Sequence, residues 1–173
     1  MSASRGAPGC GGAAAVIAAQ LAEHGIPHTV HHHVAVRTIE EARAQVPHLT
    51  EDLLKTVVFE IAASARRLLV AVDCTARVDY RGVAAAAGCS RRALRLVPPE
   101  RVAAELGFEI GGVGPFRVAP EVEVLLDAGS APGRRVRVGG GSRTATIELA
   151  FGDLASLSGA TLAAVARTDA ASA

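Results

Sequence analysis

The run from Leu53 to Ile61 is the stretch that most restricts how this chain can fold. Its residues are mainly β-branched or aromatic, and charged residues stand only near its two ends, which is typical of a buried β-strand. A second run of the same kind, Arg67 to Asp73, follows after a short connection. The two runs therefore predict a β-hairpin.

Lys55, near the start of this strand, is the only lysine among the 18 basic residues of the chain. Where arginine serves almost everywhere else, one retained lysine is expected to do something that arginine cannot, because its ammonium is compact and its pKa falls readily on burial. The alternative is that Lys55 has no specific function and is a strand-end lysine whose side chain extends over apolar neighbours into water. The sequence alone leaves both interpretations open.

Length and composition predict a single domain over residues 13–168, with a disordered tail at 1–12 and a short tail at 169–173. The 173 residues are 50% hydrophobic but only 3% aromatic, so the core should be aliphatic. The net charge is +1. A nucleic-acid partner would therefore have to be held by a local patch of arginines, because the chain has no strong overall field.

The cysteines and the apolar segments indicate a cytoplasmic protein with no membrane partner. Cys10, Cys74 and Cys89 are odd in number and lack a C-x-x-C spacing, as expected of unpaired thiols in a reducing compartment. The apolar run from Ala13 to Ala19 is too short to span a bilayer. A signal peptide is not expected, since only Arg5 precedes that run.

The remaining segments alternate irregularly between helical and extended patterns, which favours an α+β fold with a mixed sheet. Thr38 and Glu41 form a capping box, and Asp79 can cap the helix that follows it. Helices are expected at 14–24, 38–45, 80–87 and 99–107, with a closing helical pair at 151–157 and 161–166. Further strands are expected at 28–33, 122–127, 135–138 and 144–149.

Two glycine-rich loops are candidates for binding. The segment Gly111–Phe116 has three glycines and a proline, so its backbone amides can approach an anion or oxyanion closely. A tight structural turn is the alternative, and for the second run, Gly139–Gly141, a hairpin turn is sufficient.

Histidine and cysteine chemistry is less well supported by the sequence. His31 and His33 share one face of a strand, but no third ligand is evident, so a metal site is not predicted. His33 is a candidate for the mouth of a pocket. Cys74 follows a strand end, where a buried inert thiol is the more common state than a nucleophile.

Several motifs in order resemble one family. They are Leu54–Phe59, Arg77-Val78-Asp79, Gly107–Phe116, a strand ending at Asp127, and Gly140-Gly141 followed by Ile147-Glu148-Leu149. In this order and spacing they resemble the YbaK/prolyl-tRNA synthetase-associated domain family, over about residues 14–167. That family comprises free-standing aminoacyl-tRNA deacylases and the editing insertion of bacterial prolyl-tRNA synthetases.

The resemblance implies a mixed sheet partly closed into a barrel and surrounded by helices. It implies hydrolysis, in trans and without metal or cofactor, of the ester of a mischarged tRNA, with tRNA for proline expected and prolyl-tRNA synthetase a possible partner. Lys55, Gly111, Gly112 and Val113 would be the catalytic residues. The substrate-binding residues would be Gly114, Pro115, Phe116, His33, Asp127, Gly139 and Gly140.

Two departures bear on specificity. Some Cys-tRNA deacylases of this family carry serine where this chain has Gly139, and aspartate where it has Thr146. The amino acid removed is therefore not predicted. The alternatives to a deacylase are a non-catalytic module of the same fold that binds tRNA or a synthetase, and a hydrolase of some other small ester.

Overall fold

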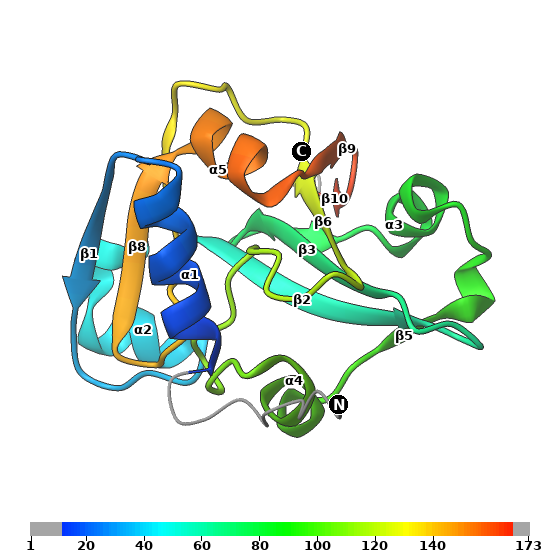
Figure 1. Ribbon diagram of the computed structural model, residues 1–173, viewed down its shortest axis with the longest axis horizontal. Helices are drawn as coiled ribbons and strands as arrows, with labels where there is room; N and C mark the ends of the chain where they lie inside the picture. Colours follow the sequence, from blue (N-terminus) through cyan, green and yellow to red (C-terminus); the bar gives the residue numbers. More distant parts are fainter. Residues whose placement is uncertain (1–11, 168–173) are drawn as a thin grey trace, which may run out of the picture.

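The computed structural model describes residues 12–167 (Figure 1). The expected tails lie outside these residues, except for Gly12, which begins the first helix. The helices are α1 (Gly12–Glu23), α2 (Ile39–Gln45), α3 (Tyr80–Ala87), α4 (Pro99–Leu106) and α5 (Phe151–Ser158), with 3-10 turns η1 (Pro47–Leu49) and η2 (Arg91–Ala93). The strands are β1 (His28–His32), β2 (Leu54–Ile61), β3 (Arg67–Asp73), β4 (Arg77–Val78), β5 (Leu94–Leu96), β6 (Val122–Asp127), β7 (Arg135–Gly139), β8 (Ala145–Ala150), β9 (Thr161–Ala163) and β10 (Ala166–Arg167).

The strands form a mixed α+β architecture, as predicted. A five-stranded sheet has the order β5-β2-β3-β6-β9, in which β2 is antiparallel to β3 and β5, while β3, β6 and β9 run parallel. β1, β8 and β7 form an antiparallel three-stranded sheet, and β10 pairs with β4. Among the described residues none of these sheets closes on itself, so the partial barrel is not seen. A parallel β-bridge between Leu53 and Arg137 joins the two larger sheets, and beside it the Arg137 N–H donates to the Asp52 carbonyl at 2.9 Å.

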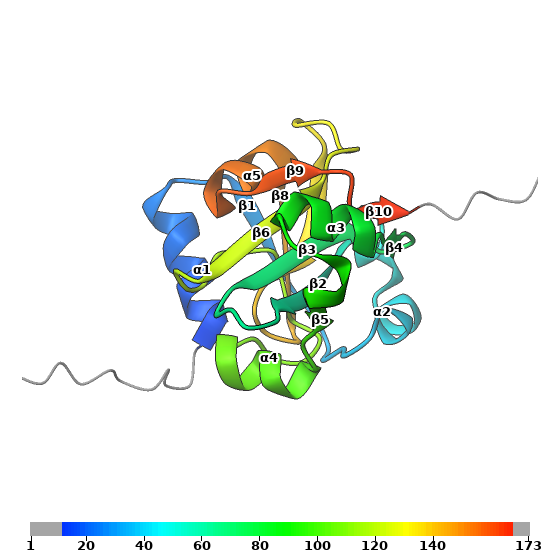
Figure 2. The same cartoon turned by 90° about the vertical axis from the view of Figure 1, so that its right-hand side faces the viewer.

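Two hydrophobic cores fill the spaces on either side of the five-stranded sheet. The larger lies between this sheet and the three-stranded one, and α1, α4 and α5 contribute to it. The smaller lies under α3, which covers the other face (Figure 2). Both cores are mainly aliphatic, as the composition predicts, and burial of this surface at about 25 cal/mol per Å² is the main stabilising contribution.

The predicted helix boundaries agree with the capping contacts. The Glu41 N–H donates to Thr38 Oγ1 at 3.1 Å, and the Glu41 carboxylate accepts from the Arg37 N–H at 2.7 Å. The Arg81 N–H donates to Asp79 Oδ1 at 3.1 Å. The contacts to Thr38 and Asp79 satisfy amides that the first helical turn leaves without partners, and the Glu41 carboxylate satisfies the amide of the residue before the cap. No described helix has the length and apolar character needed to cross a bilayer.

The prediction of a closing helical pair is half wrong. α5 forms where expected and ends at Gly159 in a left-handed conformation. The segment from Thr161 to Ala166 instead contributes β9, which pairs with the edge of β6. Alanine-rich segments favour helix locally, but here the unsatisfied backbone edge of a buried strand decides the conformation.

Candidate functional site

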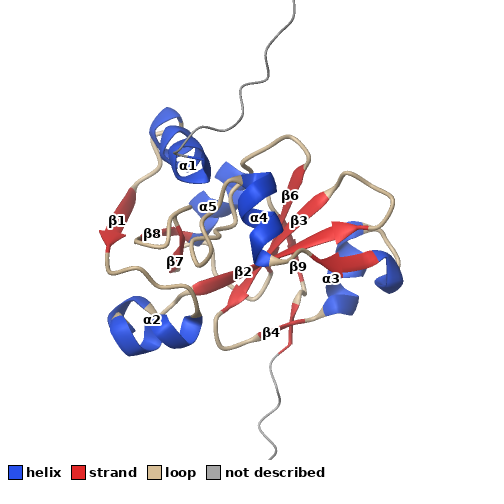
Figure 3. Ribbon diagram, turned by 90° about the horizontal axis from the view of Figure 1, so that it is seen from below, coloured by secondary structure: helices blue, strands red, loops and turns tan. Residues whose placement is uncertain are grey.

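A cavity of about 540 Å³ lies against the edge of β2. Six consecutive residues of the chain, 53–58, line it. Because successive side chains of a strand point to opposite faces, a cavity that contacts all six must approach the strand from its edge. Figure 3 shows β2 passing between α2 and α4, and both helices contribute residues to the wall.

The edge of β2 is open because β5 stops short of it. The Val97 N–H donates to the Val58 carbonyl at 2.9 Å, and the same register would place Pro99 opposite Thr56. Pro98 and Pro99 instead turn the chain into α4, and proline has no N–H to donate to the ladder. Alternate residues present their backbone groups to the same edge, so the Thr56 N–H and carbonyl face this gap.

Thr56 also carries a polar atom without a partner. Its Oγ1 is buried and makes no hydrogen bond within the described part of the chain. A buried hydroxyl left unpaired costs about 1–3 kcal/mol. Thr56 is thus an unsatisfied polar residue in the wall of the cavity, and its place beside Lys55 in the sequence is the one signal that could have pointed to it.

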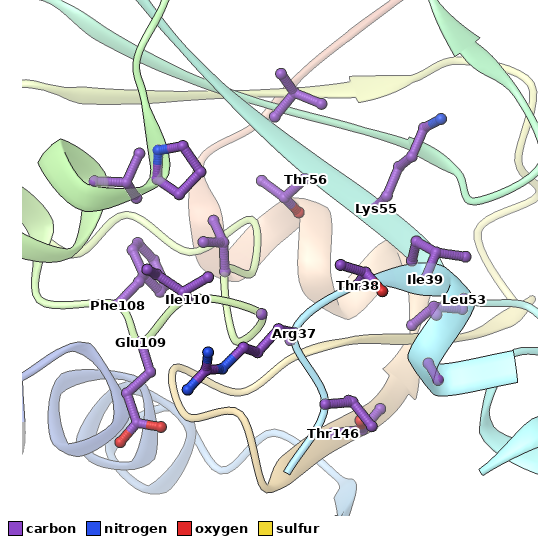
Figure 4. A pocket seen from close by; sticks show the side chains of 18 of the residues that line it. Arg37, Thr38, Ile39, Leu53, Lys55, Thr56, Phe108, Glu109, Ile110 and Thr146 are labelled. Carbon is purple, nitrogen blue, oxygen red and sulfur yellow. The ribbon is translucent and has the colours of Figure 1, made fainter. Parts of the chain in front are cut away.

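Lys55 lies on the face of β2 opposite to the face that carries the Thr56 side chain. Its side chain points away from Thr56 and from the lower part of the cavity (Figure 4). The residue is partly exposed, and no described side chain or carbonyl is paired with its ammonium. Lys55 is one of the residues that line the cavity, and its unpaired ammonium is free to bind an anion; its catalytic role stays a prediction.

The Gly111 loop forms another part of the wall, through Glu109, Ile110, Gly111 and Val113. The Gly112 N–H donates to the Glu109 carbonyl at 2.9 Å and is therefore already used in a turn. Within residues 12–167 no acceptor bonds the N–H of Gly111 or of Val113. These two amides, and not that of Gly112, are the available donors of the loop.

Close backbone packing explains most of the glycines in both loops. The Gly141 N–H donates to the Gly112 carbonyl at 2.8 Å. A Cβ on Gly139 would lie 2.7 Å from the Val113 carbonyl carbon and closer still to its oxygen, and a Cβ on Gly114 would collide with the Gly139 carbonyl. The two glycine runs are therefore pressed together, and this packing accounts for Gly112, Gly114 and Gly139. Gly111 packs in the same way against the backbone of Val36 and Arg37 and has a left-handed φ of +90°, while Gly111, Val113 and Gly139 also line the cavity.

His33 and Thr146 form a hydrogen-bonded pair in the cavity wall. Nε2 of His33 lies 2.9 Å from Thr146 Oγ1, and Nδ1 lies 2.7 Å from the Val34 carbonyl oxygen. Both residues line the cavity, and Thr146 is buried. His33 therefore lies at the cavity, and its role in substrate binding stays a prediction. Thr146 was noted from the sequence only as a departure from relatives, and its hydrogen bond depends on strands that are far apart in the chain.

Several predicted site residues do not line the cavity. Phe116 is fully buried in the larger core, where its ring packs against aliphatic side chains and cannot contact a ligand in the cavity. The loop glycines that contact other backbone, together with the buried proline, are also absent from the wall; these residues are Gly112, Gly114, Pro115 and Gly140.

Asp127 has a structural role instead. Its Oδ1 accepts hydrogen bonds from the backbone N–H groups of Val165 and Ala166 at 3.2 and 3.1 Å, and its Oδ2 accepts one from Gly129 at 3.2 Å. These bonds hold the last segment of the chain against the end of β6. Asp127 therefore lies outside the cavity wall. In the described part of the chain no three His, Cys, Asp or Glu side chains form a group that could hold a metal ion.

Comparison with known proteins gives the same family as the motifs. Residues 33–157 match the family described as the aminoacyl-tRNA editing domain. A crystal structure of hypothetical protein APE2540 superimposes with a TM-score of 0.74 at 22% identity, covering 88% of this chain and 99% of that one, which supports the fold. A structure described as a candidate trans-editing enzyme for prolyl tRNA synthetase has a TM-score of 0.71 at 27% identity, covering 90% of this chain and 98% of that one.

The matched segment extends from His33 to the interior of α5, and it contains β2, the Gly111 loop and the strand that carries Thr146. All of the cavity-lining residues named above lie within it. This chain belongs to the aminoacyl-tRNA editing domain family, also called the YbaK family.

Proposed function

We propose that this protein hydrolyses, in trans, the ester that joins a wrong amino acid to tRNA, with tRNA for proline the expected substrate. The observation that carries the proposal is the cavity at the open edge of β2. It combines an unpaired lysine, two unbonded loop amides and a backbone edge that offers both a donor and an acceptor. A volume of about 540 Å³ is in the range of small-molecule sites and suits an aminoacyl group with part of a ribose.

The chemistry needs no covalent nucleophile, because an aminoacyl ester is already activated. The protein has to hold the acyl group, place a water molecule and stabilise the oxyanion that develops on the carbonyl. The N–H groups of Gly111 and Val113 are suited to the oxyanion. The Thr56 carbonyl can accept a hydrogen bond from the amino group of the aminoacyl moiety.

Lys55 would anchor the nucleic acid. Its ammonium is on the opposite face of β2 from Thr56, so it is better placed for a phosphate of the terminal nucleotides than for the ester. The likeness to a structure described as a candidate trans-editing enzyme for prolyl tRNA synthetase supports tRNA for proline, and association with that synthetase is part of the same proposal. We further propose that one domain over residues 13–168 performs the reaction in the cytoplasm.

The test is a panel of tRNAs for proline charged with Ala, Cys, Ser, Thr or 2-aminobutyrate. We expect at least one ester to be cleared faster than correctly charged Pro-tRNA, and Lys55→Ala to abolish this activity with the urea unfolding midpoint unchanged. Arg92→Ala, which removes an exposed cation away from the cavity, is the matched control. Binding of the tRNAs without hydrolysis would favour the non-catalytic module, and a Lys55→Ala variant as fast as wild type would refute the role of the lysine.

A further inference from the structure

The His33–Thr146 pair has a defined direction of hydrogen bonding. The Val34 carbonyl can only accept, so Nδ1 of the neutral His33 ring must carry the proton. Nε2 then has a free lone pair and accepts from the Thr146 hydroxyl at 2.9 Å. A hydroxyl that donates to a base, with the base oriented by a third group, is the arrangement that activates oxygen nucleophiles in enzymes.

The surrounding strands hold this pair in place. The His33 N–H donates to the Thr144 carbonyl at 2.9 Å, which extends the β1–β8 ladder by one bond and fixes the backbone of the histidine. The ring is held at both nitrogens. Side chains whose rotamers are fixed in this way are preorganised for chemistry.

Thr146 is brought close to the Gly111 loop by its neighbour across the sheet, Gly139. It is directly opposite Gly139 in the β7–β8 pairing, and Gly139 packs against the Val113 carbonyl. The absence of a side chain at position 139 therefore leaves the Thr146 hydroxyl beside the loop that we assign to the oxyanion. A water molecule between Thr146 and that loop would donate a hydrogen bond to Thr146 Oγ1 and accept hydrogen bonds from the loop N–H groups.

We infer that Thr146 and His33 form a proton relay that activates the attacking water; this rests on the function proposed above. The water oxygen bonds to the ester carbonyl carbon while one water proton passes to Thr146 Oγ1, and the Thr146 proton passes to His33 Nε2. The carbonyl becomes an oxyanion. When the tetrahedral intermediate collapses, the bond to the ribose oxygen breaks, and the proton returns from His33 through Thr146 to that oxygen. The products are a free amino acid and an uncharged tRNA end.

A direct role of Thr146 as nucleophile is less favourable. An acyl-Thr146 would be another alkyl ester, so a second water attack with the same machinery would still be required. Thr146 is thus the catalytic residue of the relay, and His33 acts through it as the proton acceptor.

The test measures kcat and KM on the ester that wild type clears fastest. Thr146→Val removes the hydroxyl at constant shape and should lower kcat by about 100-fold or more, the usual contribution of general-base catalysis, with little change in KM. Thr146→Ser should recover kcat to within about tenfold of wild type. His33→Gln should lose as much as Thr146→Val, and the double variant should lose no more than either, because residues that act as one unit are not additive.

His32→Gln is the matched control, since His32 is exposed on the opposite face of β1 and does not line the cavity. A Thr146→Val kcat within threefold of wild type would overturn the relay, as would an acyl group trapped on Thr146 and found by mass spectrometry. The two proposals are separated by the wild-type result. Hydrolysis by wild type that Thr146→Val retains refutes the relay alone, whereas the absence of any hydrolysis refutes both.

Discussion

Gly139→Ala tests whether the contact between the two glycine runs positions the cavity loop. The new Cβ would lie 2.7 Å from the Val113 carbonyl carbon and 2.8 Å from the Gly112 carbonyl carbon. Both are backbone atoms, so no side chain can rotate away, and the loop would have to move by about 0.5–1 Å to reach ordinary van der Waals contact.

The cost can be estimated from two opposing effects. Overpacking of a closed contact destabilises by about 1–3 kcal/mol, while replacement of glycine within a strand recovers about 0.5–1 kcal/mol of chain entropy. We therefore expect a net loss of about 1–2 kcal/mol in the free energy of unfolding. With a urea m-value of about 1–3 kcal/mol/M, the unfolding midpoint should fall by about 0.5–1 M.

The assay is urea unfolding of Gly139→Ala beside Gly133→Ala. A Cβ on Gly133 would meet no atom within 4 Å, and the residue has no left-handed φ, so its variant should stay within about 0.5 kcal/mol of wild type. Deacylation by Gly139→Ala should also fall, since a displacement of about 1 Å at a reacting centre can cost about 100-fold in rate. Equal midpoints for the two variants would refute the packing argument.

Two further predictions concern stability. Hydrogen bonds from Arg135, His31 and Arg137 lower the pKa of Glu148 to about 2. Because the folded state has the lower pKa, the ionised Glu148 stabilises the fold fully above about pH 5, and this contribution is lost as the pH falls toward 2. The free energy of unfolding of Glu148→Gln should therefore be about 1–2 kcal/mol lower than that of wild type at pH 7, after allowance for solvent screening. In urea unfolding, this difference should be smaller at pH 3. A difference that does not change with pH would contradict the assignment of the stabilisation to the ionised Glu148 carboxylate. Thr56→Val should raise the free energy of unfolding by about 1 kcal/mol, because it removes a buried hydroxyl that has no partner, and a variant less stable than wild type would show that the hydroxyl is satisfied in solution.

Local patterns were sufficient for most of the elements. The β2–β3 hairpin, the caps at Thr38 and Asp79, and the helix that begins after Pro98 depend on neighbours within a few residues, and all agree with the structure. The prediction for Thr161–Ala163 was wrong because the conformation of this segment depends on β6, more than thirty residues earlier, whose free edge it pairs with.

Some features of the candidate site also follow from local patterns, whereas others were decided only by the tertiary structure. The order of residues made Lys55 and the Gly111 loop candidates, because the solitary lysine and the glycine spacing are properties of the chain, and the resemblance to the family then favoured them as site residues. The folded arrangement was needed to show which loop amides are unbonded, that Phe116 and Asp127 serve the fold, and that Thr146 meets His33. Each of these outcomes depends on hydrogen bonds and packing between strands distant in sequence, and such contacts leave no local pattern from which they could be predicted.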